Sequence, residues 1–208
     1  MVMGWPDMYV PQIKIADDVF GVENDSTWIM KEDILGFCDL DKIGATVMSL
    51  WCSYLQTRFL NHSGLNKVYA FLNPSWVGNK AGSYAKRVTN LSQRLSDIDP
   101  GQFLVSPWID SKHWMVILIQ PSSQRVAFLD PLNGLMPGDI EKVVKEALMK
   151  YNLQNSKKAN SRPNITYHKC RLQPDIVQCE YYCMKFIQEL MIVPNPTRHL
   201  ATKVYTII

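Results

Sequence analysis

The sequence has no run of 18 apolar residues, so no membrane-spanning helix is expected. Residues 1–11 lack a charged stretch followed by an apolar one, and a secretory signal is not expected either. The sequence also lacks a strong excess of either charge, because 22 Lys and Arg against 19 Asp and Glu leave a net charge of +3. So small a bias does not indicate a nucleic-acid partner by itself. What is present, 208 residues of which 47% are hydrophobic, is typical of one soluble globular domain.

Cysteine is sparse and odd in number. An odd count without a secretory signal indicates reduced thiols in an intracellular protein, one of them a candidate nucleophile and the others small buried residues. A zinc site is not favoured, because the pattern H-x-C-x8-C-x3-C from His168 to Cys183 matches no common structural zinc site. No metal or cofactor is therefore expected. The five cysteines are Cys38, Cys52, Cys170, Cys179 and Cys183.

Apolar spacing and turn residues predict an α+β fold in which helices pack on a small sheet. Residues 1–25 are predicted to be an irregular segment, and residues 26–208 to form one domain. Ser26 or Thr27 would cap a first helix to about Phe37, and a longer helix would follow Asp39 or Asp41 and end at 61–64. Further helices are predicted at 84–95, 139–151 and 179–192, and strands at 68–72, 102–108, 113–120, 124–129 and 165–168.

Four residues at the ends of these elements have the chemistry of a nucleophilic site. His113 precedes a buried strand, Asp130 ends the next strand, and Cys179 begins the last helix. The positive end of a helix dipole favours a thiolate, an imidazole would take the thiol proton, and a carboxylate would orient the imidazole. Gln173, six residues before the thiol, could donate an amide N–H to an oxyanion. Unrelated core or surface residues remain the alternative on pattern alone.

A second alternative rests on the segment 142–171, which contains eight Lys or Arg residues and one acidic residue, Glu146. Such a patch could bind an acidic partner or nucleic acid. A solvated helix and loop is the more usual explanation of a charge run. No nucleic-acid-binding motif accompanies this one, so nucleic acid is not a favoured partner.

Three blocks, HWMVILIQ, VAFLDPL and QPDIVQCEYYCMKF, resemble the His-Trp, Asp and Gln-Cys blocks of the ubiquitin-like-protein (SUMO) specific cysteine proteases. The gaps of 17 residues from His113 to Asp130 and of 49 residues from Asp130 to Cys179 are typical of that family. Trp28 and the helical pattern after it extend the resemblance to about residues 26–192. The Tyr-Tyr pair after the thiol and the DPL turn most resemble the divergent plant branch, which is often associated with transposons.

This resemblance implies a papain-like cysteine protease fold, with a small central mixed sheet and the nucleophile at the N-terminus of a helix. Cys179 would be the nucleophile, His113 the general base and acid, and Asp130 the orienting carboxylate. Gln173 would help to form the oxyanion hole. No cofactor is implied.

The resemblance also implies a substrate. Trp28 and Trp114 would flank a narrow tunnel in which two indole faces leave room for glycine but not for a Cβ, so that shape selects a Gly-Gly tail. The partner would be a ubiquitin-like modifier of the SUMO type, in its conjugates or its precursor. The family resemblance places such an enzyme in the nucleus. Otherwise an intracellular protein of this kind is expected in the cytoplasm, and no membrane partner is expected because no apolar run is long enough.

The sequence departs from the family pattern around the nucleophile. Glu180 replaces the usual Gly after the thiol, Gln178 replaces an acidic residue before it, and Lys31 replaces an acidic residue after the first Trp. A carboxylate beside the thiol opposes thiolate formation, although solvent would screen a side chain that points outward. We therefore expect a modest loss of activity. The alternative is a weak or inactive domain of the same fold that binds a modifier or another partner.

Overall fold

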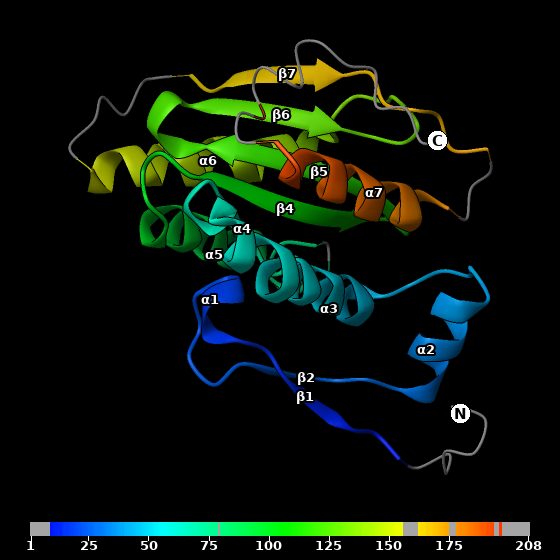
Figure 1. Ribbon diagram of the computed structural model, residues 1–208. Coiled ribbons are helices and arrows are strands. Elements are labelled where there is room, and N and C mark those ends of the chain that lie inside the picture. Colours follow the sequence, from blue (N-terminus) through cyan, green and yellow to red (C-terminus); the bar gives the residue numbers. More distant parts are fainter. Residues whose placement is uncertain (1–8, 79, 156–161, 175–177, 194–195, 197–208) are drawn as a thin grey trace.

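The computed structural model describes residues 9–78, 80–155, 162–174, 178–193 and 196. At its centre is a five-stranded sheet with the strand order β3-β4-β5-β6-β7 (Figure 1). The two outer pairs are parallel and the two inner pairs antiparallel, so the predicted small mixed sheet is confirmed. The strands are β3 (Tyr69–Phe71), β4 (Phe103–Asp110), β5 (His113–Gln120), β6 (Arg125–Leu129) and β7 (Asn164–His168).

Helices cover both faces of this sheet, and the central strand β5 is buried on each side. Trp114, Val116 and Leu118 lie in the core shared with two helices, whereas Met115 and Ile117 lie in the core shared with the other two. Strand side chains alternate between faces, so Trp114 is directed to the helices of the first core. The first core contains α3 (Ala45–Leu55) and α7 (Cys179–Met191), and the second contains α5 (Tyr84–Asp97) and α6 (Gly138–Gln154).

The N-terminal part is more ordered than the sequence suggested. β1 (Gln12–Lys14) pairs with β2 (Ser26–Trp28), and α1 (Asp17–Phe20) lies between them, so the described part of 1–25 is not irregular throughout. The prediction of a helix from Ser26 or Thr27 is wrong, because this segment is extended in the pair. The helix α2 (Lys31–Cys38) begins later, where the Asp33 carboxylate accepts a hydrogen bond from Met30 N at 2.9 Å.

The remaining elements lie close to their predicted positions. α3 continues through a π-helical turn, η2 (Gln56–Leu60), and through α4 (Asn61–Ser63). The run stops at Gly64, whose φ of 72° is left-handed. Residues 1–8 of the predicted N-terminal segment and residues 197–208 of the predicted domain lie outside the described residues. Within the described part of the chain, no helix has both the length and the apolar character needed to cross a membrane. The described residues also contain short 3-10 turns, η3 (Leu65–Lys67), η4 (Pro74–Trp76) and η5 (Pro121–Ser123).

Candidate active site

Two successive hairpins bring His113 and Asp130 together. A two-residue turn joins β4 to β5, and its residues Ser111 and Lys112 have φ values of 48° and 71°, as in a type I′ turn. β5 then pairs antiparallel with β6, with Val116 opposite Leu129. The residue after β6, Asp130, therefore lies beside the start of β5. Local hairpin geometry thus closes the 17-residue gap between the two side chains.

The Asp130 carboxylate is a strong hydrogen-bond acceptor for His113. Its Oδ1 lies 2.6 Å from His113 Nε2 and accepts a hydrogen bond from Leu132 N at 2.9 Å, while its Oδ2 accepts one from Gly134 N at 2.8 Å. Burial opposes ionisation of Asp130, but these donors outweigh it, and the pKa of the carboxyl lies below its usual value. The charged carboxylate can therefore orient the imidazole, and it leaves Nδ1 as the ring nitrogen for proton transfer.

The loop after Asp130 is shaped around its carboxylate. A Cβ on Gly134 would lie 2.7 Å from Asp130 Oδ2, so any larger residue here would displace the carboxylate. Asn133 exchanges two hydrogen bonds with the backbone of Cys170, at 2.8 and 3.0 Å. Gln173 is buried, and its N donates to Pro131 O at 3.0 Å. The structure thus holds the Gln173 backbone against the Asp130 loop, while its role in an oxyanion hole stays a prediction.

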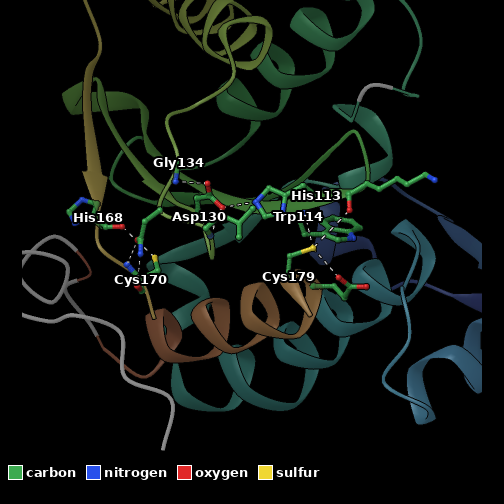
Figure 2. Close-up of polar contacts among 11 residues, drawn as sticks. His113, Trp114, Asp130, Gly134, His168, Cys170 and Cys179 are labelled. Carbon is green, nitrogen blue, oxygen red and sulfur yellow. Dashed lines mark hydrogen bonds and ion pairs between the residues drawn. The ribbon is translucent and has the colours of Figure 1, made fainter. Parts of the chain in front are cut away.

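Cys179 is the first residue of α7, as predicted for the nucleophile. Its sulfur accepts a hydrogen bond from Trp114 N at 3.4 Å and lies 4.0 Å from Lys112 O, so it contacts the backbone on both sides of His113. Figure 2 shows the sulfur and the Asp130 carboxylate on opposite sides of His113. Among the described residues, the hydrogen bonds of this sulfur go to backbone atoms and to Glu180, and none joins it to the imidazole ring.

The Cys179 thiol is held in its protonated form. Its sulfur lies 3.0 Å from Glu180 Oε2. Burial first, and then the hydrogen bond to Glu180, raise the pKa of the Cys179 thiol to about 12, although the hydrogen bond from Trp114 N lowers it. The sequence predicted that Glu180 would oppose thiolate formation, with solvent screening the effect if its side chain pointed outward. The side chain points inward instead, because Glu180 is 1% exposed and its carboxylate contacts the sulfur.

Glu180 connects the nucleophile to a distant loop. Its Oε1 accepts a hydrogen bond at 2.9 Å from Ile43 N, 137 residues away in the sequence. The carbonyl oxygen of Ile43 in turn accepts a hydrogen bond from Trp114 Nε1 at 3.2 Å. Sequence reasoning singled out Glu180 as unusual but missed Ile43, because an apolar residue contributing its backbone leaves no signal in a side-chain pattern.

The two indoles predicted to form the tunnel are placed very differently. Trp114 is 1% exposed and lies against the thiol through its backbone N. Trp28 is 56% exposed and belongs to β2, in the small sheet that Figure 1 shows across α3 from the large sheet. Within the described residues, no hydrogen bond or ring contact joins the two indoles. A tunnel between them stays a prediction.

The other cysteines are mostly core residues, as expected. Cys52 and Cys183 are fully buried, and burial raises the pKa of both thiols. Burial also raises the pKa of Cys170 to about 12. Cys38 is exposed at the end of α2, which makes it the exception.

Comparison with known proteins identifies a family over most of the chain. Residues 41–202 match the model of the Ulp1 protease family, C-terminal catalytic domain. A search of curated proteins returned no significant match.

Solved structures share the fold at low sequence identity. The crystal structure of a de-sumoylating protease is 15% identical, with a TM-score of 0.66, and the match covers 93% of this chain and 76% of that one. The C-terminal Ulp1 protease domain in complex with Smt3, the yeast ortholog of SUMO, is also 15% identical, with a TM-score of 0.56 and coverage of 90% and 79%. The SUMO protease Ulp1 with its catalytic cysteine oxidised to a sulfenic acid is 14% identical, with a TM-score of 0.57 and coverage of 85% and 78%.

Proposed function

The chain belongs to the Ulp1 protease family, and we propose that it is a cysteine protease that cleaves after the C-terminal Gly-Gly of a SUMO-like modifier. Cys179 is the proposed nucleophile, His113 the general base and acid, Asp130 the orienting carboxylate and Gln173 an oxyanion donor. The observation that carries this assignment is the 2.6 Å contact between His113 and Asp130, next to a thiol that touches the backbone on both sides of His113.

In the proposed reaction, Nδ1 of His113 accepts and returns the proton, because Nε2 is bonded to Asp130. The S–H bond of Cys179 breaks, the proton moves to Nδ1, and the sulfur attacks the glycine carbonyl carbon. When the C–N bond breaks, the leaving amine takes that proton from His113, and a thioester remains. Water then gives a proton to His113 as its oxygen attacks the thioester carbon. The C–S bond breaks, the sulfur takes that proton from His113 to restore the thiol, and the modifier leaves with a free C-terminal carboxyl group.

The proposed substrate is a modifier joined to a target lysine by an isopeptide bond, or the peptide bond of a modifier precursor. One solved relative is a complex with a SUMO ortholog, which supports this class of partner. Trp114 beside Cys179 would supply one wall for the diglycine tail. Trp28, exposed on β2, is the proposed second wall. A nuclear location and a place in the plant, transposon-associated branch remain predictions from the resemblance.

A panel of modifiers carrying a C-terminal vinyl sulfone tests the assignment. We expect a covalent adduct with a SUMO-like member of the panel, located by mass spectrometry at Cys179. Cys179→Ser should give no adduct, whereas Cys38→Ser, which changes the exposed thiol, should react as the wild type does. An adduct on another cysteine, or one that persists in Cys179→Ser, would show that the nucleophile is misassigned.

One observation favours a second candidate. The buried contact between Cys179 and Glu180 holds the thiol protonated, which suits a domain of the same fold that binds a modifier without cleaving it. This alternative predicts saturable, non-covalent binding of a modifier with no adduct, and the same affinity in Cys179→Ser.

A further inference from the structure

Four hydrogen bonds form a closed ring that includes the sulfur of the proposed nucleophile, Cys179. Trp114 N donates to Cys179 Sγ at 3.4 Å, and that sulfur lies 3.0 Å from Glu180 Oε2. Ile43 N donates to Glu180 Oε1 at 2.9 Å, and Trp114 Nε1 donates to Ile43 O at 3.2 Å. The ring therefore joins the start of α7, the start of β5 and the loop before α3, and the Glu180 carboxylate connects two of these three segments.

The two oxygens of this carboxylate have different partners. Oε1 accepts from a backbone N–H in a buried place, where an unmatched donor would be costly. Oε2 faces a sulfur, and the hydrogen bond between them exists while the thiol carries its proton. A thiolate there would lie beside a like charge with little solvent to screen it. One side chain thus stabilises the local fold and disfavours the reactive form of the nucleophile.

We propose that Glu180 holds Cys179 in a protonated resting form and, through Ile43, keeps the Trp114 wall in place. This inference rests on the proposed function, in which Cys179 is the nucleophile. For attack, the S–H···Oε2 hydrogen bond must break before the proton passes from sulfur to His113 Nδ1. Glu180 therefore slows formation of the thioester, whereas a glycine at this position would leave Ile43 N without its acceptor.

A substitution to glutamine separates the two roles. In Glu180→Gln, the amide oxygen can still accept from Ile43 N, while the amide nitrogen replaces the charged oxygen and can donate to sulfur. Glu180→Gly removes both contacts. The matched control is Glu189→Gln, which removes the same charge from the same helix at a residue paired with Lys185 at 3.8 Å.

The test is the rate at which iodoacetamide alkylates Cys179 between pH 6 and 10, followed by mass spectrometry of the peptide that carries it. This rate reports the thiolate fraction and needs no modifier. The titratable groups around Cys179 and Glu180 are the same in all variants. Among the described residues they are Tyr181 and Cys183 on α7, His113 at the start of β5, Asp130 after β6, and Asp41 before α3.

In the wild type, we expect alkylation at Cys179 to keep rising up to pH 10, because an ordinary thiol titrates near ~8.5 and this one titrates higher. Glu180→Gln should alkylate at least about tenfold faster at pH 7, a change of one pKa unit or more, with little change in melting temperature. Glu180→Gly should also alkylate faster but melt roughly 2–10 °C lower, because a buried N–H loses its acceptor. Glu189→Gln should match the wild type in alkylation rate.

A wild-type rate that levels off at or below pH 8.5 overturns the inference without any variant. So does a Glu180→Gln rate equal to that of the wild type. Single-turnover capture by the modifier–vinyl sulfone then separates the two proposals. If alkylation changes as expected but no variant captures a modifier, the protease assignment fails and the role of Glu180 stands. If wild type and Glu180→Gln capture a modifier equally fast, the protease assignment stands and the role of Glu180 fails.

Discussion

Asp130 and Glu180 are both buried carboxylic acids beside a proposed catalytic residue, yet they act on their neighbours in opposite ways. Asp130 is surrounded by three N–H donors, from His113, Leu132 and Gly134, so it stays charged and orients the imidazole. Among the described residues, Glu180 has one backbone donor, from Ile43, and its other oxygen faces the Cys179 sulfur. The effect of a buried carboxylate therefore depends on which donors surround it and on whether its neighbour must become an anion.

This contrast divides the site into two halves. We call the side with His113 and Asp130 the prepared half and the side with Cys179 and Glu180 the restrained half. On the His113 side, the carboxylate stabilises the positive charge that the ring gains when it takes a proton. On the Cys179 side, burial and Glu180 oppose the negative charge that the sulfur must gain. Thiol ionisation is accordingly the step expected to limit formation of the thioester, and each half can be tested separately.

Loss of the nucleophile should have the largest effect. We expect Cys179→Ser to reduce single-turnover cleavage of a SUMO-like modifier–fluorophore substrate by about 10⁴-fold or more, because covalent catalysis is lost. Cys38→Ser should cleave at the wild-type rate. Cleavage by Cys179→Ser within tenfold of the wild type would mean that the restrained half of the site is not where the chemistry occurs.

Removal of the charge from the prepared half should come next. Asp130→Asn keeps the shape but loses the charge that orients His113, and we expect kcat to fall by about 10²–10⁴-fold. The rate of Cys179 alkylation should change far less, because among the described residues Asp130 makes no hydrogen bond to the sulfur and acts on it only through His113. Asp97→Asn on the exposed face of α5 is the control. If Asp130→Asn altered alkylation as much as cleavage, the division into two halves would be wrong.

The contribution of Gln173 should be smaller. If its amide donates to the oxyanion, Gln173→Ala should lower kcat by about 10²-fold and leave KM near its wild-type value. Gln93→Ala, at an exposed position on α5, should change neither parameter. A change in KM alone would instead assign Gln173 to substrate binding.

The smallest effect concerns stability in acid. The pKa of Asp130 is lowered in the folded protein, so its stabilising contribution is complete above the unfolded pKa of ~3.9 and is lost as the pH falls through the lower folded value. Urea unfolding should therefore show an advantage of about 1–3 kcal/mol for wild type over Asp130→Asn at pH 7. That advantage should shrink at pH 3. An equal advantage at both pH values would show that the hydrogen-bond donors around Asp130 do not stabilise its charged form.

The prepared half of the site was predictable from sequence because its contacts are nearly local. The turn between β4 and β5 and the next hairpin place His113 and Asp130 side by side, and nearly continuous apolar runs reveal both strands. The start of α7 at Cys179 was likewise visible in a helical pattern that begins at the thiol. The N-terminal segment was misjudged because β1 and β2 are three residues long, too short for a periodic signal.

By itself, the amino-acid sequence determined the α+β fold and the order of its main elements, because these follow from local propensity and hydrophobic periodicity. The family resemblance was needed to select His113, Asp130 and Cys179 from the polar residues at element ends. It also marked Glu180 as the residue that departs from the family pattern. Tertiary structure decided what that departure does. A carboxylate at a helix start can face solvent or the interior, and the choice depends on a backbone N–H of Ile43, 137 residues away, that satisfies it in the core. The same packing buries Cys179, so the thiol that the helix start alone would activate is protonated instead.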